Sequence, residues 1–221
     1  MPLPPAVRRL TPAPLRDSPR LRGLALGAGL IPPRPMHTER EGELLRRVAR
    51  AGGCVVEVGV YEGSSSVQLV DAMAPDATLH LVDPYVENAL RSGWRGVERA
   101  TRRTVSRAAR RSGGPRLRWH VCTSAEAARG WNGTPVDVVF IDGDHTSEGA
   151  RLDWDLWSPH VPAGGTVVFH DAREGKPDGR GLPGPTAVVD ELFRGESAAP
   201  GWVISDEVDS AVAVTRVATT S

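Results

Sequence analysis

The segment VDVVFID, residues 136–142, is an almost unbroken apolar run that ends at an aspartate. A run of this kind is typical of a strand that is buried on both faces, as in a parallel sheet. Similar β-branched runs recur along the chain with helical patterns between them: CVVEVGV (54–60), TLHLVDPY (78–85), RLRWHVCTS (116–124) and TVVFHD (166–171). This alternation predicts a doubly wound α/β fold, with helices on both faces of a mostly parallel sheet.

The first helix of this fold is predicted to begin after Thr38. Thr38 is suited to cap a helix, and Glu41 follows three residues later, which is the capping-box spacing. Two strands, WVISD (202–206) and SAVAVTRV (210–217), are predicted near the other end of the chain.

The N-terminal segment differs in composition from the rest. Residues 1–35 contain nine prolines, too many for regular structure, so we expect an extended Pro-rich N-terminal arm, within which RGLALGAGLIPP is apolar enough to dock locally. Residues 36–221 are expected to form one domain. A substrate pocket is expected to draw on the arm and on the segments 85–115 and 172–185.

Composition narrows the function classes. The 27 basic and 27 acidic residues cancel, which argues against a nucleic-acid partner. No apolar run is long enough to span a membrane, so no membrane partner is expected. Cys54 and Cys122 offer neither a disulfide framework nor a metal-ligand spacing, which favours a reducing, cytoplasmic compartment.

Acidic residues occur in or just after four of the predicted parallel strands. They are Glu57, Asp83, Asp142 and Asp171, the last of which follows His170. In open α/β sheets the ligand lies outside the carboxyl ends of the strands, so we expect these side chains to meet at one edge. One such aspartate alone would be a helix cap or a turn residue, but that explanation is poor for four together.

The loop EVGVYEGSSS after the first strand has the character of a cofactor loop. Gly59 and Gly63 allow tight turns beside a ligand, and Ser64–Ser66 open a helix whose N-terminus presents free amides. Tyr61 stands where a nicotinamide fingerprint needs its second glycine, which disfavours a nicotinamide oxidoreductase. Asp83 at the end of the next strand is placed to accept hydrogen bonds from the hydroxyls of an adenosine ribose.

With these motifs the chain resembles the class I S-adenosylmethionine-dependent methyltransferases over residues 38–217. The resemblance rests on VVEVGVYEGSS, LHLVDPY, VCTSAEA, VDVVFIDGDH and PAGGTVVFHD, in this order. Within the class, the sequence is most similar to the group of macrocin O-methyltransferase and the cephalosporin hydroxylase-like proteins. The resemblance implies a Rossmann-like, seven-stranded sheet that ends in an antiparallel hairpin.

The resemblance also implies a cofactor site for S-adenosylmethionine. Ser124 would lie beside the adenine and Asp83 would bind the ribose. The residues of the first loop, with Asp142, would complete the cofactor site: Glu57, Gly59, Tyr61, Gly63 and Ser65.

The sequence also resembles the metal-dependent members of this group. Their pattern implies a divalent metal at Asp142, His170 and Asp171, with His145 as the general base. The chain departs from the pattern because His170 replaces one residue of an acidic pair. One fewer oxygen ligand weakens the case for magnesium, and a histidine would accept a softer ion such as manganese, iron or zinc.

The resulting hypothesis is an O-methyltransferase that acts on a hydroxyl of a small molecule, such as a sugar or natural product. The alternatives are an N-methyltransferase, an aminopropyl transferase, and a non-catalytic cofactor-binding or assembly protein with the same fold. Members of this group often self-associate, so the resemblance also leaves a homo-oligomer open.

Overall fold

The computed structural model describes residues 19–85, 96–195 and 198–218. Within these ranges the sheet has seven strands in the order β3-β2-β1-β4-β5-β7-β6. β1 to β5 are parallel, and β7 pairs antiparallel with both β5 and β6. The predicted doubly wound sheet with a closing hairpin is therefore confirmed; its strands are β1 (Cys54–Val58), β2 (Thr78–Val82), β3 (Arg116–His120), β4 (Val138–Ile141), β5 (Thr166–Phe169), β6 (Trp202–Val208) and β7 (Ala211–Arg216).

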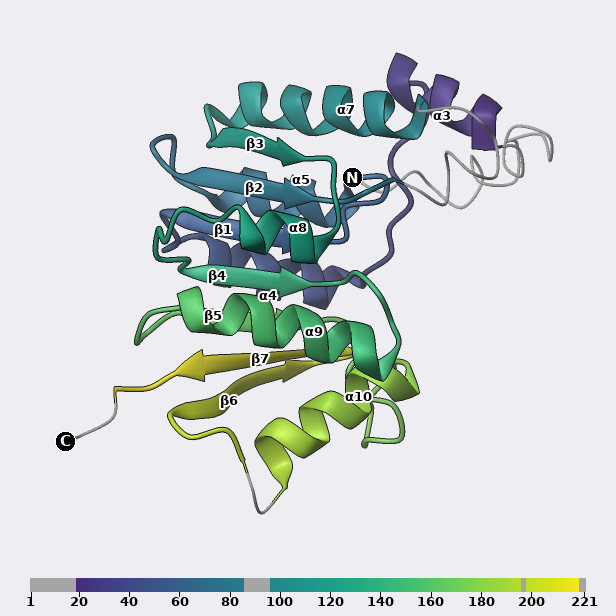
Figure 1. Cartoon of the computed structure of the whole chain (residues 1–221). Coiled ribbons are helices and arrows are strands. Elements are labelled where there is room, and N and C mark those ends of the chain that lie inside the picture. The colour runs from purple at the N-terminus through teal and green to yellow at the C-terminus, as the bar shows by residue number, and fades with distance from the viewer. Residues whose placement is uncertain (1–18, 86–95, 196–197, 219–221) are drawn as a thin grey trace.

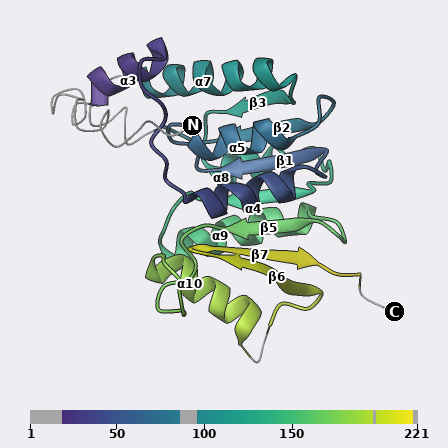
Figure 2. The same ribbon diagram turned by 180° about the vertical axis from the view of Figure 1, so that it is seen from behind.

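Helices cover both faces of the sheet (Figure 1). On the face turned toward the viewer in Figure 2, α4 (Glu39–Ala49) and α5 (Ser64–Ala72) pack on an apolar core that α7 (Gly96–Ser112) also enters. The opposite face packs against α8 (Ser124–Arg129), α9 (Ser147–Trp157) and α10 (Pro183–Val189). A 3₁₀ turn (Ser158–His160) follows α9, and a π-helical turn (Asp190–Arg194) follows α10. In the described ranges, no helix has the length and hydropathy that a membrane crossing requires.

Helix α4 begins as its sequence predicts. The Thr38 hydroxyl accepts a hydrogen bond from the Glu41 amide, and the Glu41 carboxylate accepts one from the Thr38 amide. This reciprocal pair fixes where the chain turns into the helix.

The sequence suggested an extended N-terminal arm, but part of this segment is helical. Residues Pro19–Ala28 form helix α3, because no proline occurs between Pro19 and Pro32 and a proline is tolerated at the first helical position. The helix ends at Ala28, and the φ of 75° at Gly29 allows the Leu30 amide to donate a hydrogen bond to the Ala25 carbonyl. Leu26 is buried, and α3 lies against α7 (Figure 1). The structure of residues 1–18 lies outside the described ranges.

Residues 29–38, here called the crossing segment, lead from α3 to α4 past the carboxyl ends of the central strands (Figure 1). The Arg34 amide donates to Glu62 in the loop after β1, and the Met36 amide lies 3.5 Å from the Ser64 hydroxyl. The Thr38 hydroxyl donates to Asp209 in the turn before β7. The edge where the sequence predicts a ligand is thus bordered by the N-terminal part of the chain.

Candidate active site

The loop after β1, residues 59–63, is here called the donor loop. It passes very close to the end of β4, because a Cβ on Gly59 would lie 2.0 Å from the Asp142 carbonyl oxygen. Gly59 and Gly63 have φ values of 86° and 82°, and Tyr61 has a φ of 49°. Positive φ is unfavourable for a bulky residue such as Tyr61, so its neighbours must hold the conformation.

Asp83 helps to hold Tyr61 in this conformation. Its Oδ2 accepts hydrogen bonds from the amides of Val60 at 2.9 Å and Tyr61 at 2.8 Å, and its Oδ1 accepts one from the Tyr85 amide at 2.7 Å. A carboxylate has about four lone-pair positions, so Asp83 retains acceptor capacity for one further donor such as a ribose hydroxyl. The residue predicted to bind the ribose thus also anchors the donor loop.

Glu57 lies inside β1 and is fully buried. The hydroxyls of Ser65 and Ser66, in the first turn of α5, donate to its two carboxylate oxygens at 2.5 and 2.6 Å. Burial raises the pKa of Glu57 to about 8 despite these bonds. Glu57 and Ser65 are therefore in contact, and Ser66 is a second partner that the sequence analysis did not single out.

Ser124 opens α8, but its hydroxyl points toward α9. It accepts a hydrogen bond from Trp157 at 2.9 Å, and it also interacts with the buried Asp153. The side chain therefore helps to hold α8 to α9, and its partner Asp153 lies beside Gly143, the residue after Asp142.

The remaining predicted residues form one group at the ends of β4 and β5, here called the acid–histidine cluster: Asp142, His145, His170 and Asp171. Nε2 of His145 lies 3.4 Å from Oδ1 of Asp142 and 3.4 Å from Oδ2 of Asp171. Nδ1 of His170 lies 3.0 Å from Oδ1 of Asp142 and 3.5 Å from Oδ2 of Asp171. Each histidine therefore lies against both carboxylates, as the meeting of parallel strand ends predicts.

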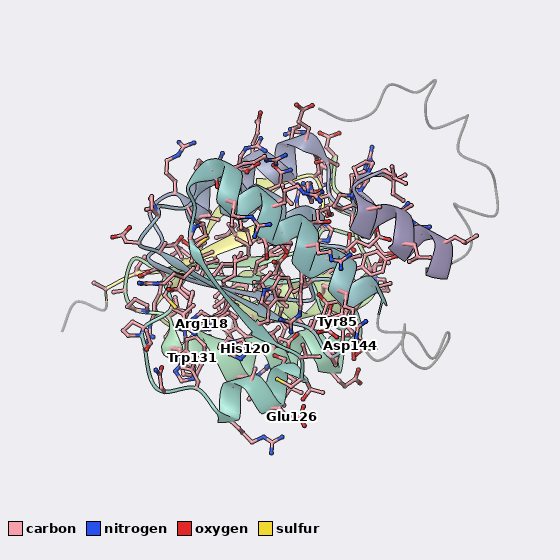
Figure 3. All side chains as sticks on the ribbon, turned by 90° about the horizontal axis from the view of Figure 1, so that it is seen from above. Tyr85, Arg118, His120, Glu126, Trp131 and Asp144 are labelled. Carbon is pink, nitrogen blue, oxygen red and sulfur yellow. The ribbon has the colours of Figure 1, made fainter. Side chains whose placement is uncertain are left out.

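Asp144 has a local structural role between the members of this cluster. Its Oδ1 accepts a hydrogen bond from the Thr146 amide at 2.9 Å, just before α9 begins. Figure 3 shows Asp144 and Tyr85 toward the end of the molecule where α3 lies. In the segment FIDGDH, then, the first aspartate and the histidine belong to the cluster, and the second aspartate shapes the turn.

Glu41 is the residue of this region that the sequence analysis missed. Its Oε2 lies 3.6 Å from Nε2 of His170, and its Oε1 accepts hydrogen bonds from the amide and hydroxyl of Ser210 at 2.7 and 2.5 Å. The spacing after Thr38 identified Glu41 as a capping residue, and no local signal connects it to a residue in β5. A carboxylate behind the imidazole would orient His170.

The charges of the cluster are strongly coupled. The neighbouring carboxylates of Asp142 and Asp171 raise the pKa of His145 to about 9. Burial would lower the pKa of His170, but contacts with Asp142, Asp171 and Glu41 raise it well above its ordinary value. The two histidines in turn lower the pKa values of Asp142 and Asp171 against the effect of burial. In the cation-free cluster the two carboxylates therefore favour the protonated form of both histidines, because they raise the pKa of each imidazole.

The cluster also has the donor set of a metal site. Asp142, His170 and Asp171 each offer one ligand atom, and these atoms lie within 4.8 Å of one another. In the described residues, Nε2 of His170 is buried without a hydrogen-bond partner and faces Glu41, which leaves Nδ1 directed at the two aspartates. Two carboxylates and one imidazole fit a first-row transition ion better than magnesium.

The family model described as a methyltransferase domain matches residues 56–172. Among solved structures, cofactor-bound Rv0187 from MTB is 18% identical and has a TM-score of 0.64, with 98% of each chain covered. The O-methyltransferase TomG from Streptomyces achromogenes, involved in tomaymycin synthesis and solved in complex with SAM, is 16% identical. Its TM-score is 0.60, and the comparison covers 89% of this chain and 88% of that chain.

A curated relative, the uncharacterized protein R132 of Acanthamoeba polyphaga mimivirus, is 30% identical over 61 residues. The match spans 28% of this chain and 28% of that protein.

Proposed function

We propose that this chain, which belongs to the methyltransferase domain family, transfers a methyl group from S-adenosylmethionine to a hydroxyl oxygen of a small molecule. The observation that carries the proposal is the contact between the donor loop and the acid–histidine cluster. Gly59 packs against the Asp142 carbonyl, so a donor held by the loop would lie next to the groups able to activate an acceptor.

The donor sulfonium is already activated for transfer. The protein must therefore bring the acceptor oxygen in line with the methyl carbon and the sulfur, and must exclude water. The oxygen–methyl bond forms as the sulfur–methyl bond breaks, and the hydroxyl proton passes to His145. A general base in this position would contribute about 10²- to 10⁴-fold to the rate.

His145 can accept this proton only when its imidazole is neutral. Asp142 and Asp171 oppose that state in the cation-free cluster, where they raise the pKa of His145 to about 9. Asp142, His170 and Asp171 would hold a divalent cation, which would supply Lewis acidity and offset the negative charge beside His145. The proposal therefore includes metal assistance, with manganese, iron or zinc preferred over magnesium.

The proposal also covers the kind of acceptor, the cellular compartment and the oligomeric state. The acceptor is proposed to be a sugar or other natural product, with no nucleic-acid partner. The cytoplasmic compartment and the homo-oligomer expected from the sequence also stay predictions.

The proposal is tested by calorimetric titration of the purified protein with S-adenosylmethionine and, separately, with NAD. Micromolar binding of S-adenosylmethionine that is lost in Asp83→Ala would support the donor assignment. Turnover is then measured on a panel of hydroxylated acceptors, with and without divalent cations. Binding of NAD in place of S-adenosylmethionine would overturn the proposal, and donor binding without turnover on any acceptor would favour the assembly-protein alternative.

A further inference from the structure

Helix α3 is fastened to the donor loop by an ion pair that is largely buried. Nε of Arg22 lies 2.6 Å from Oε1 of Glu62, and Nη2 of Arg22 lies 2.6 Å from Oε2. The two side chains are 14% and 4% exposed. The Arg34 amide donates to the same Oε2 at 2.8 Å. Two parallel bonds between a guanidinium and a desolvated carboxylate belong to the strong class of hydrogen bonds, so this attachment is specific in geometry.

Glu62 lies at the most constrained point of the donor loop. The residue before it, Tyr61, has a φ of 49°, and the residue after it, Gly63, has a φ of 82°. Two left-handed conformations on either side of one residue make a sharp turn. The conformation of Tyr61 costs about 1–3 kcal/mol and persists only where the surroundings enforce it.

Three different elements enforce this turn. From β2, the Asp83 carboxylate accepts the amides of Val60 and Tyr61. From α7, the buried Thr101 hydroxyl donates to the Tyr61 carbonyl at 2.9 Å. From α3, Arg22 holds the side chain of Glu62. The first two contacts fix the backbone around Tyr61, and Arg22 fixes the residue that follows it.

We propose that Arg22 is a positioning residue of the donor site. Through Glu62 it holds Tyr61 and Gly63 in the backbone conformation that receives the methionine part of the donor. This inference rests on the proposed use of S-adenosylmethionine. It makes α3, which lies outside the matched residues 56–172, a working part of the site.

The test compares Arg22→Gln and Glu62→Gln with the wild-type full chain in two measurements. The first is the calorimetric Kd for S-adenosylmethionine, and the second is hydrogen exchange of the donor-loop amides in donor-free protein. We expect each variant to weaken binding about tenfold, in line with the strain at Tyr61. We also expect the loop amides to exchange faster. Arg22→Lys, which keeps the charge, should recover part of both losses.

A matched control is available in Arg151→Gln. Arg151 forms an ion pair with Glu191 across the same sequence separation, but this pair is solvent-exposed and joins α9 to the turn after α10. The control should leave both the Kd and the loop exchange unchanged. If a single variant does not fold, the double variant Arg22→Gln/Glu62→Gln leaves no unpaired buried charge and serves in its place.

The outcomes separate this inference from the proposed function. Wild-type protein that does not bind S-adenosylmethionine contradicts the proposed function, and the exchange measurement still decides whether Arg22 holds the loop. Wild-type protein that binds, together with folded variants that bind and exchange equally well, overturns the inference and reduces the ion pair to a contribution to stability.

Discussion

His170 and Asp142 meet across the neighbouring strands β5 and β4, with 3.0 Å between Nδ1 of the histidine and Oδ1 of the aspartate. Asp171 approaches the same nitrogen from the end of β5, and Glu41 lies behind the ring. The imidazole therefore lies between carboxylates. A cation bound at this point would have the imidazole nitrogen as one of its ligands. We therefore expect the His170 nitrogen to influence which cation the cluster prefers.

Replacement of His170 by glutamate should change the metal preference. The wild-type protein is expected to bind Mn²⁺ more tightly than Mg²⁺, because an imidazole nitrogen suits the softer ion. His170→Glu would supply a third carboxylate and narrow or reverse that difference. Calorimetric titration with each ion measures this, and His160→Gln, in the 3₁₀ turn after α9, is the control. The same Mn²⁺ to Mg²⁺ ratio in all three proteins would remove His170 from the ligands.

Replacement of His145 by glutamine should remove turnover but not donor binding. The His145 side chain is 41% exposed, and its distances to the carboxylates of Asp142 and Asp171 are as long as 3.4 Å. Its replacement should therefore leave the donor loop intact. We expect the rate on a responsive acceptor to fall by about 10²- to 10⁴-fold, as for loss of a general base. Rate measurements are paired with the Kd for S-adenosylmethionine. Turnover within a factor of a few of wild type would exclude His145 as the base.

Glu57 should make the stability of the protein depend on pH. Burial raises its folded-state pKa from 4.5 to about 8, so folding favours the neutral acid. The stabilising effect is present below pH 4.5 and is lost as the pH rises through 8. Glu57→Gln, which stays neutral, should therefore gain stability relative to wild type across this window. Urea unfolding at several pH values gives the difference, and a constant difference would show that Glu57 is ionised in the fold.

Gly59→Ala should destroy the donor site by collision as well as by strain. The new Cβ would lie 2.0 Å from the Asp142 carbonyl oxygen, at a φ of 86°. Gly133→Ala is a matched control, because its φ is 82° and no atom within 4 Å would meet the new Cβ. The control should lose about 1 kcal/mol of stability from φ strain alone. We expect a larger loss and no measurable donor binding in Gly59→Ala; equal behaviour of the two variants would contradict the close packing of Gly59.

The parallel strands of the sheet and the position of the cluster follow from local patterns in the sequence. Parallel strands end at one edge, so Asp83, Asp142 and Asp171 had to lie at the same edge once the strands were identified, with Asp142 and Asp171 on the neighbouring strands β4 and β5. The capping box of Thr38 and Glu41 was predictable for the same reason, because its signal lies within four residues.

Other parts of the site depend on contacts that no local pattern encodes. Glu41 reaches His170 only because α4 packs beside the end of β5. Arg22 reaches Glu62 across 40 residues, from a helix in which Leu26 is buried. The resemblance places Ser124 beside the adenine, which stays a prediction, and no local pattern signals the hydrogen bond that its hydroxyl accepts from Trp157.

The antiparallel direction of β7 has a practical consequence. Because β7 runs against β5, the chain leaves the sheet after Arg216 at the edge opposite the acid–histidine cluster (Figure 1). A linker placed after β7, to a surface or to a fused partner, would leave the cluster facing the solution. A linker placed before α3 would instead begin next to the helix that holds the donor loop, so immobilised forms of this protein are best tethered after β7.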